Sequence, residues 1–595
     1  YPKYRYVEDH FARVNTAMTR GTPAIRVGVI HPVESCWIHW GPAEQTALAR
    51  EELDTNFENV TEWLLFGSVD FDYISESLLP SLCECGGAPL EVGNMKYDVI
   101  IVPGCETVRA STCERLDAFR RAGGKLIFMG DAPKYLDARP SDIPAKLWAE
   151  AEHISFTRGA LLGALEGYRN VDIRQANGEL TGSLVHQLRR DGDGLWLFVA
   201  QGKLPYNKDI SRKQKIKITV KGIYRATLYD TLGGKIKPCR FSHSGDTTVI
   251  PAELWLHDSL LIRLDPCDTE ETWSPAAAQK TVEVPMRIPA CAPYALSEPN
   301  VLLLDRAEFS FDGGEFEPSE ELLRIDTLLR RKLGWTPWGG SSNQPWCIPA
   351  EPTEHTVKLR FTIESRIPVR DAHLALEAAE DTAITLNGVR VPSVIDGYFT
   401  DRSIKTVALP PIPAGISVLE LEAPFGKRTA IEWCYLMGSF GVRLAGAHAV
   451  IEALPETLGF ETITTQGLPF YSGCVSYFID VTTTGGDLSV RLPQYRAAVY
   501  ECSLDGGKPT TGAFAPYLVR WKNVPAGVHR VEVKLYISRT NAFGHLHCAD
   551  RNLSYASPSA WRTSGDAWCY EYRLSEEGLT ASPVFSEIKP VPAES

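Results

Sequence analysis

Between residues 24 and 131, strand-like and helix-like stretches alternate, and this alternation limits the possible folds more than any other feature. Residues 46–66 carry apolar side chains three to five positions apart, which predicts a helix. Short apolar runs typical of parallel strands buried on both faces occupy residues 24–30, 97–102 and 125–129, and residues 69–74 alternate with the period of two that also predicts a strand. Strands that alternate with helices predict a doubly wound parallel sheet.

A second helix is predicted between the last two of these strands. Ser111 and Glu114 have the spacing of a capping box, in which each side chain bonds the other residue's amide. Gly123-Gly124 is expected to end the helix, because a left-handed residue after a helix is cheapest as glycine.

Ligands of such sheets bind beyond the carboxyl ends of the strands, and three interpretations of this edge compete. A dinucleotide site needs G-x-G-x-x-G after the first strand, and the residues from His31 onward contain no such run. A hydrolase needs a nucleophile on a strand-to-helix turn, and Cys105 follows a strand, although within a Pro-Gly-Cys-Glu turn. We favour the third interpretation, a sheet domain without catalytic residues of its own.

The residues after the first strand are the best candidates for substrate contacts. They mix charged groups with aromatic surface, which suits a hydroxyl-rich ligand because polar groups orient it and rings supply contact area. A purely structural interface is the alternative. The candidates are His31, Glu34, Trp37, His39 and Trp40.

A separate acidic group is formed by Asp70, Asp72 and Glu76. On an alternating strand Asp70 and Asp72 point the same way. Two neighbouring carboxylates could form the acid/base pair of glycoside hydrolysis. They could equally be helix-capping and solvated groups, which is the interpretation that we favour.

From residue 169 onward the pattern is dominated by strands. Residues 169–265 predict a small antiparallel β-sandwich, with a hairpin at Asp191-Gly-Asp-Gly194. Six prolines in residues 266–300 indicate an extended linker. Residues 319–333 predict a helix with Glu320 and Glu321 in its first turn and basic residues in its last, an order that suits the helix dipole.

Residues 301–450 and 451–595 look like an internal repeat of two β-sandwiches. Each contains an Asn-Gly or Asp-Gly turn, at residues 387–388 and 505–506, and such pairs favour type I′ hairpins. Each later contains Pro-Ala-Gly before an alternating strand, at residues 413–415 and 525–527.

Aromatic and histidine clusters in these sandwiches have two interpretations each. Trp335, Trp338, Trp346, Trp561 and Trp568 could form platforms for sugar rings, or pack in the core, which we favour. His545, His547 and Asp550 could suggest a metal, because His-x-His on a strand places both rings on one face. No further ligand can be assigned, so we predict no metal site.

Several segments together resemble one known architecture. Residues 26–37, 66–76 and 97–104 resemble the amidotransferase-like accessory domain that follows the catalytic barrel in large bacterial glycoside hydrolases. These are the family 106 α-L-rhamnosidases and, more distantly, the family 42 β-galactosidases. Residues 4–21 resemble the helix that leaves that barrel, and the repeated sandwiches resemble the galactose-binding-like jelly rolls of family 2 glycosidases.

The resemblance implies six segments and a function. Residues 1–21 would end a preceding barrel, 22–168 form the sheet domain, 169–265 the small sandwich, 266–300 the linker, and 301–450 and 451–595 the jelly rolls. The implied activity is hydrolysis of a terminal sugar, such as an L-rhamnoside or β-galactoside, by two carboxylates. A barrel needs roughly 250 residues, so we expect those carboxylates outside this chain, on a barrel in the same or a cleaved chain.

The resemblance and the composition also bear on partners. Family 42 relatives trimerise through this sheet domain, which implies a homo-oligomer, and the family implies calcium without assignable ligands; we predict no other cofactor. A net charge of -13 argues against nucleic acid, and no apolar run approaches the ~20 residues of a membrane helix. Fourteen cysteines without metal-like spacing favour reduced thiols and a cytoplasmic location. The alternative function is a non-catalytic carbohydrate-binding protein.

Overall fold

The computed structural model describes residues 3–207, 209–210, 212–268, 271–275, 281–338, 347–550 and 557–591. The fold is multidomain and mostly β, with many antiparallel sheets. The chain divides into two compact units. Unit 1 comprises Tyr1–Ala278 with Phe514–Pro516, and unit 2 comprises Gln279–Ala513 with Tyr517–Ser595.

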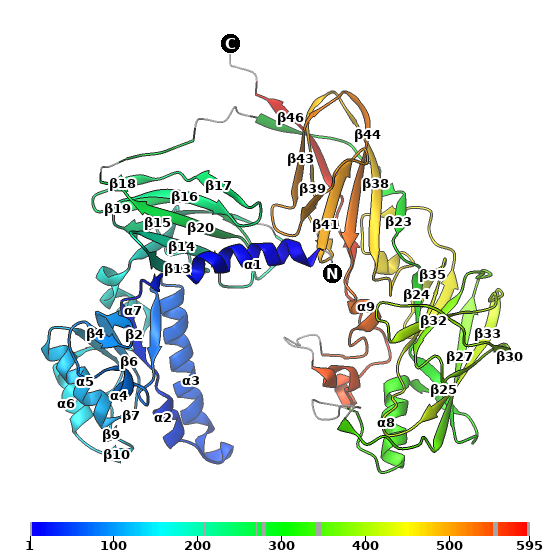
Figure 1. Cartoon of the computed structure of the whole chain (residues 1–595), viewed down its shortest axis with the longest axis horizontal. Helices are drawn as coiled ribbons and strands as arrows, with labels where there is room; N and C mark the ends of the chain where they lie inside the picture. Colours follow the sequence, from blue (N-terminus) through cyan, green and yellow to red (C-terminus); the bar gives the residue numbers. More distant parts are fainter. Residues whose placement is uncertain are drawn as a thin grey trace. The chain divides into compact units, whose positions relative to one another are not determined.

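Unit 1 begins with a five-stranded sheet in which every neighbouring pair is parallel, in the order β11-β8-β6-β2-β3. The predicted alternation of strands and helices is confirmed here, and the strand predicted at residues 125–129 has those bounds (Figure 1). The strands are β2 (Val27–Ile30), β3 (Phe71–Ile74), β6 (Val99–Pro103), β8 (Lys125–Met129) and β11 (Glu152–Ile154).

Helices cover both faces of this sheet, as Figure 1 shows, so its strands are buried on both sides. Val60 and Leu64 of α3 pack on one face, and Leu116 and Phe119 of α5 pack on the other. Each fully buried side chain of this size contributes about 1.5–3 kcal/mol. The helices are α3 (Ala43–Leu65) and α7 (Arg158–Ala164) on the first face, and α4 (Leu79–Leu82), α5 (Ala110–Arg121) and α6 (Ile143–Glu150) on the second.

The predicted capping box at the start of α5 is wrong. The N-cap is Arg109, whose backbone is extended, and no side chain of the helix caps it. Ser111 already lies in the first turn. Two carboxylates from other segments bond the free amides instead: Glu76 accepts from the Arg109 amide at 2.8 Å and Asp137 from the Ala110 amide at 3.2 Å.

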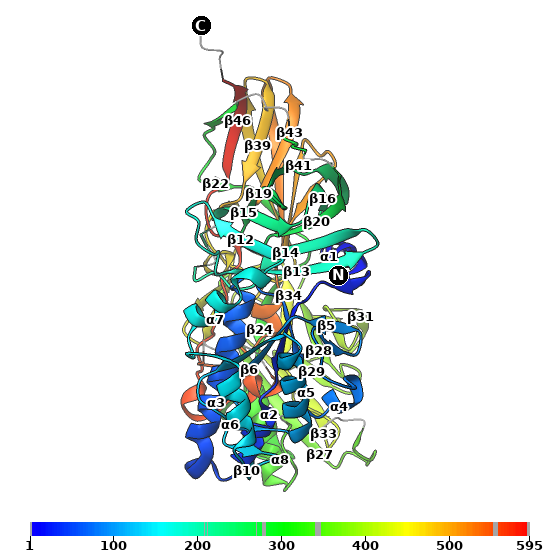
Figure 2. The same ribbon diagram turned by 90° about the vertical axis from the view of Figure 1, so that its left-hand side faces the viewer.

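The second part of unit 1 is a sandwich of two antiparallel sheets, and helix α1 (Tyr4–Met18) packs on the outer face of one of them through Ala17. That sheet has the order β1-β13-β14-β20-β16-β17, and its partner β12-β15-β19-β18. Figure 2 shows β12, β15 and β19 next to one another. The strands are β1 (Thr22–Pro23), β12 (Val171–Gln175), β13 (Leu184–Asp191), β14 (Gly194–Gln201), β15 (Lys213–Lys221), β16 (Tyr224–Asp230), β17 (Lys235–Pro238), β18 (Ser242–Ser244), β19 (Thr247–Trp255) and β20 (Ser259–Pro266).

The hairpin predicted at residues 191–194 is confirmed, since Asp191 pairs with Gly194 across a two-residue loop. Gly192 has φ +59° there.

We expect Gly192→Ala to lower the free energy of unfolding of unit 1 by about 1–2 kcal/mol, the cost of a left-handed backbone for alanine. Gly163 lies in helix α7, with open space around an added Cβ. Gly163→Ala should therefore raise the free energy of unfolding by roughly 0.5–1 kcal/mol. Thermal unfolding of both variants measures the two effects. Equal changes in stability for Gly192→Ala and Gly163→Ala would contradict the role given to the positive φ of Gly192.

Unit 2 contains two sandwiches. The first is built from the sheet β24-β34-β28-β32-β31 and a larger sheet around β27 and β33. The second is built from β23-β38-β44-β41-β42 and β21-β46-β39-β43. The long central strands are β27 (His355–Ser365), β33 (Gly415–Phe425), β38 (Cys474–Thr483) and β44 (Gly527–Tyr536); the others that matter below are β24 (Asn300–Leu304), β34 (Cys434–Gly438) and β46 (Val584–Pro590).

The segment predicted as a linker, residues 266–300, is partly built into the second sandwich. Residues 281–296 contain β21 (Thr281–Pro285), β22 (Cys291–Ala292) and β23 (Tyr294–Leu296). β21 and β23 stand at the edges of their sheets, where proline is tolerated because one side of the strand needs no amide. Proline content alone therefore misidentified edge strands as a spacer.

The helix predicted at residues 319–333 starts later than expected. Residues Glu317–Glu321 form β26, which pairs with β25 (Arg306–Phe311), and α8 spans Leu322–Lys332. Glu321 is the N-cap, and its carboxylate accepts from the amides of Leu323 and Arg324 at 3.1 and 2.9 Å. Glu320 lies in the strand, so only the basic last turn agrees with the prediction.

Both predicted type I′ turns are present. Asn387 and Gly388 have φ values of +50° and +79°, and Asp505 and Gly506 have +50° and +71°. In each turn the Asn or Asp side chain accepts a backbone amide of the neighbouring long strand, from Val418 at 2.8 Å and from Arg530 at 2.9 Å. The two turns thus share one hydrogen-bonding pattern, as an internal repeat would.

Between β44 and the end of the second sandwich, residues 540–550 and 557–577 return to the first sandwich; we name these residues the strap. His547 and Tyr572 of the strap both bond Asp305 beside β24, and Arg562 bonds Asp326 of α8. Leu546 is part of the first sandwich's core. The strap therefore completes a sandwich that the sequence predicted to end near residue 450.

Candidate functional site

The carboxyl edge of the parallel sheet gathers most of the predicted site residues. We name this edge the rim: helix α2 (Val33–Ile38) with its flanking residues, Glu76, and residues 104–109. Buried Ser35 fastens two of these segments, because its hydroxyl accepts from the amides of Glu106 and Thr107 at 3.0 and 3.2 Å. The rim is thus a fixed surface.

Arg109 joins two of the rim's carboxylates, Glu34 and Glu76. Its guanidinium Nε donates to Glu34 Oε1 at 2.9 Å, and its backbone amide donates to Glu76 Oε2 at 2.8 Å. The second oxygen of each carboxylate is buried without a hydrogen-bond partner. The sequence analysis did not identify Arg109. Its position just before a predicted helix was the feature that could have marked it as a candidate site residue.

Burial controls the protonation of Glu76, which is fully inaccessible to solvent. The pKa of Glu76 is raised to about 7, mainly by burial and in smaller part by the nearby charge of Glu34, while the Arg109 amide and Thr112 oppose the shift. Near neutral pH this carboxyl therefore exchanges its proton, while the Arg109 contact holds it in place.

Cys105 lies in the same edge but has the wrong environment for a nucleophile. Its thiol is buried, and burial together with the charges of Glu76 and Glu34 raises its pKa well above the usual value. A nucleophilic cysteine needs the thiolate, which cationic surroundings favour and apolar or acidic surroundings oppose. The geometry therefore counts against the Cys105 hydrolase.

The outer surface of the rim carries the exposed candidates. Trp37 is 58% exposed and Trp40 is 78% exposed. Between them, His39 Nε2 lies 3.0 Å from Glu106 Oε1. His31 is set apart from them, and its ring packs at a tilt against Phe57 at a ring-centroid distance of 5.0 Å. The Arg50 guanidinium lies over the Trp40 ring, 5.4 Å from its centroid. Two largely exposed indoles beside a polar pair are thus available to a ligand or to another protein surface.

Asp70 and Asp72 do not belong to this edge. They lie at the start of β3, the amino end of a parallel strand, whereas Glu76 follows its carboxyl end, so the prediction that groups the three carboxylates together is wrong. Tyr97 donates to Asp72 Oδ2 at 2.9 Å. Burial, then the charge of Asp72, raises the pKa of Asp70 to about 6, and the Leu188 amide of the sandwich bonds it. The pair is coupled, but it lies between two packed parts of unit 1.

The tryptophans of unit 2 are occupied by packing. Trp335 stacks on Phe425 at 5.8 Å, and Trp338 lies 4.5 Å from the Arg330 guanidinium. Trp568 stacks on His547 at 4.9 Å, and the indole of Trp561 donates to the Phe543 carbonyl at 2.9 Å. Trp346 lies outside the described residues.

The His-x-His segment is not a strand, and its two rings have different neighbours. His547 bonds Asp305 Oδ2 at 2.8 Å and the Cys569 carbonyl at 2.9 Å, so both of its ring nitrogens face acceptors. Burial disfavours its charged form, but the hydrogen bond and charge of Asp305 outweigh that and raise its pKa. His545 packs edge-on against Trp561 instead. In the described ranges no group of three or more His, Cys, Asp or Glu residues could hold a metal ion.

Two pockets of unit 1 were not anticipated from the sequence. One, of about 570 Å³, lies between α1 and the sandwich and includes Trp196, Tyr229, Asp191 and Arg263. Its Arg20 and Asp191 form an ion pair of 2.6 Å.

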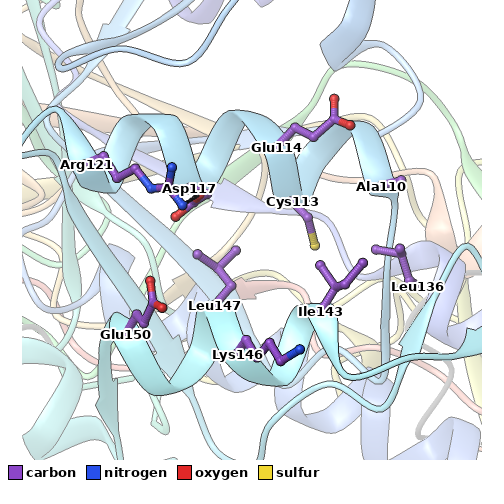
Figure 3. A pocket seen from close by; sticks show the side chains of 10 residues that line it. All are labelled: Ala110, Cys113, Glu114, Asp117, Arg121, Leu136, Ile143, Lys146, Leu147 and Glu150. Carbon is purple, nitrogen blue, oxygen red and sulfur yellow. Dashed lines mark ion pairs between the residues drawn. The ribbon is translucent and has the colours of Figure 1, made fainter.

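The other, of about 320 Å³, lies between α5 and α6, where Cys113, Leu147 and Ile143 point toward one another (Figure 3). Burial raises the pKa of Cys113 to about 12, so this thiol stays protonated and the pocket offers no nucleophile.

Comparisons with known proteins give similarities at the level of architecture. No family model and no curated protein matches the sequence. Among solved structures, the rhamnosidase from Novosphingobium sp. PP1Y is 14% identical with a TM-score of 0.46, and the match covers 98% of this chain and 41% of that one. The chain thus spans less than half of that enzyme's length.

Two further solved structures match smaller parts. The GH42 exo-carrageenase from Bacteroides ovatus is 13% identical, covering 40% of this chain and 29% of that one, with a TM-score of 0.27. The β-galactosidase from Bacillus circulans sp. alkalophilus is 11% identical, covering 41% and 42%, with a TM-score of 0.27. All three are glycoside hydrolases. Within the described residues, no helix is both long and apolar enough to cross a membrane.

Proposed function

We propose that this chain is the accessory part of a glycoside hydrolase that removes a terminal sugar, such as an L-rhamnoside or a β-galactoside. The observation that carries the proposal is the composition of the rim. Glu34 and Glu76 are held by Arg109, while Trp37 and Trp40 stand exposed beside the His39–Glu106 pair. Such a surface is suited to contact a sugar and its enclosing domain, but not to cleave a glycosidic bond.

The chemistry of glycoside hydrolysis explains why the accessory part would not itself carry the catalytic carboxylates. Glycoside hydrolysis uses one carboxyl group as an acid toward the leaving oxygen and a second as nucleophile or base across the sugar ring. Both must reach the ring, whereas Glu76 is fully buried and Glu34 is bonded to Arg109. The resemblance of residues 4–21 to the helix that leaves a catalytic barrel supports placing the acid and base on that barrel.

The test compares the 595-residue chain with the natural polypeptide or complex that contains it, on a panel of aryl glycosides. We expect turnover only by the longer form. In that form Trp40→Ala should raise KM roughly threefold to tenfold, because an aromatic contact is worth about 0.5–1.5 kcal/mol. Leu48→Ala removes an equally exposed apolar side chain from α3 and serves as the control, with KM unchanged.

Two results would overturn the proposal. One is turnover by the 595-residue chain equal to that of the longer form. The other is a natural protein that has neither a barrel domain nor a barrel partner. The intact mass of the isolated protein, with any co-purifying chain, decides the second point directly.

The alternative, a non-catalytic carbohydrate-binding protein, is favoured by a separate observation. The pocket beneath α1 has the size of a small-molecule site and combines two aromatic rings, Trp196 and Tyr229, with charged groups. This alternative expects sugar affinity, measured by calorimetry on the 595-residue chain, without turnover by any longer form.

A further inference from the structure

A groove whose charged lining residues are all positive lies on the small sandwich of unit 1. It has a volume of about 340 Å³ and lies on the β15 and β19 face of the sheet. Lys215, Lys217 and Arg240 are its charged lining residues, and none of its lining residues is a carboxylate. The chain has a net charge of -13, so a groove lined by three cations and no carboxylate departs from the acidic character of the whole chain.

The strand pattern presents the cations together. Lys215 and Lys217 are two residues apart on β15 and both are exposed, so they lie on one face about 6.6 Å apart. Arg240 is exposed beside them, before β18.

These three cations are not neutralised within the described residues, where no ion pair involves them. Glu253 stands directly opposite Lys215 in the register, but it is paired with Lys213. Asp172, on the neighbouring β12, is bonded to Arg174 at 2.9 Å. These two carboxylates of the sheet are therefore already engaged, and the three cations of the groove are exposed.

The rest of the groove suits a ring-sized ligand and not a bare ion. Val249, Pro251 and Phe241 supply apolar surface, and Ser242, Thr272 and Ser274 supply hydroxyl groups. The wall is fixed, because Phe241 and Trp273 exchange two backbone hydrogen bonds, both of 3.1 Å. Apolar surface with a few polar groups at fixed positions is the usual composition of a small-molecule site.

We propose that this groove binds an acidic saccharide, a sugar unit that carries a carboxylate or a sulfate group. The cations bind the anionic group, the hydroxyls bind sugar hydroxyls, and the apolar surface contacts the ring. The choice of a saccharide rests on the proposed function; the choice of an anion rests on the groove alone. An extended nucleic acid fits poorly, since it gains affinity from many phosphate contacts and the chain as a whole is acidic.

The experiment titrates the 595-residue chain with three oligosaccharides of equal length: a galacturonate, a sulfated galactan and a neutral galactan. At least one acidic oligosaccharide should bind, more weakly as salt rises from 50 to 200 mM, and the neutral one should not. The two acidic ligands distinguish carboxylate from sulfate. Lys215→Gln with Lys217→Gln should weaken binding roughly fivefold to tenfold, because each exposed ion pair is worth up to about 1 kcal/mol.

Lys221→Gln is the matched control, since Lys221 lies on the same strand and face but outside the groove. It should leave the affinity unchanged. The proposal is overturned if neither acidic oligosaccharide binds, if the neutral one binds equally well, if Lys221→Gln weakens binding as much as the double variant, or if an oligonucleotide of equal charge competes equally. Turnover of aryl glycosides by the longer form is a separate readout, so failure here is distinguishable from failure of the proposed function.

Discussion

Replacing Arg330 by Met is expected to lower the free energy of unfolding of unit 2 by up to about 3–5 kcal/mol, the usual cost of removing one partner of a buried ion pair, although Arg562 still contacts Asp326 at 3.3 Å. The side chains of Arg330 and Asp326 are 2% and 0% exposed, and they are joined at 3.1 Å. Arg330 also donates to the carbonyls of Lys427 and Thr429. Met fills similar space but leaves the carboxylate and both carbonyls short of a donor.

The measurement is a urea titration that follows labelling of the buried thiol of Cys434, which lies in the same core. Arg331→Met changes the neighbouring, exposed residue of the same helix and should have little effect. The double variant Arg330→Met with Asp326→Leu should lose less than the sum of the single losses, because it removes the stranded charge as well. A loss below about 1 kcal/mol for Arg330→Met would contradict the assignment of a buried pair.

Glu76→Gln is expected to remove a contribution to the stability of unit 1 that falls as pH rises from about 5 to about 7, so the variant and the wild type should differ in their pH slopes over this window. The pKa of Glu76 is raised from 4.5 to about 7 in the folded chain, with burial as the main cause. The folded state therefore keeps a proton that the unfolded state has lost across this window. Stability from this group is fully present below pH 4.5 and disappears through pH 7.

The expected slope is about 1.4 kcal/mol per pH unit from this one group, or roughly 3 kcal/mol over the window. The neutral Gln resembles the protonated acid and still accepts from the Arg109 amide. Urea titrations between pH 5.5 and 8, followed by labelling of buried Cys105, measure the slope. Glu114→Gln removes an exposed carboxyl from α5 and should follow the wild-type profile. A Glu76→Gln profile as steep as the wild type would refute this account.

Short-range features were predictable from the sequence. The strand at residues 125–129 is bounded by glycines and has no competing pattern, and the Asn387-Gly388 and Asp505-Gly506 turns need only two residues with positive φ. The periodicity of α3 likewise resides within one segment. Each of these structures is decided by neighbours in the chain.

Features that depend on distant partners were not predictable. Arg109 contacts Glu34 across 75 positions, and the pairing of β21 with β46 crosses about three hundred. The start of α8 is set by the pairing of Glu317–Glu321 with β25, which overrides the helix-like charge order. Of the eight predicted site residues, the rim unites Glu34, Trp37, His39 and Trp40 with Glu76, whereas His31 packs apart from them against Phe57. Asp70 and Asp72 were misplaced, because the sequence does not show at which end of a strand its polar residues stand.

The strap has a consequence for synthesis on the ribosome. Asp305 belongs to the first sandwich, yet its partners His547 and Tyr572 emerge more than two hundred residues later. Strand β21, at the start of unit 2, likewise cannot pair until β46 has been synthesised. Such long-range pairing delays folding and leaves sheet edges open in the nascent chain. Unit 2 should therefore remain protease-sensitive and dependent on chaperones until nearly the whole chain has left the exit tunnel, whereas the parallel sheet of unit 1 can close soon after its last strand appears.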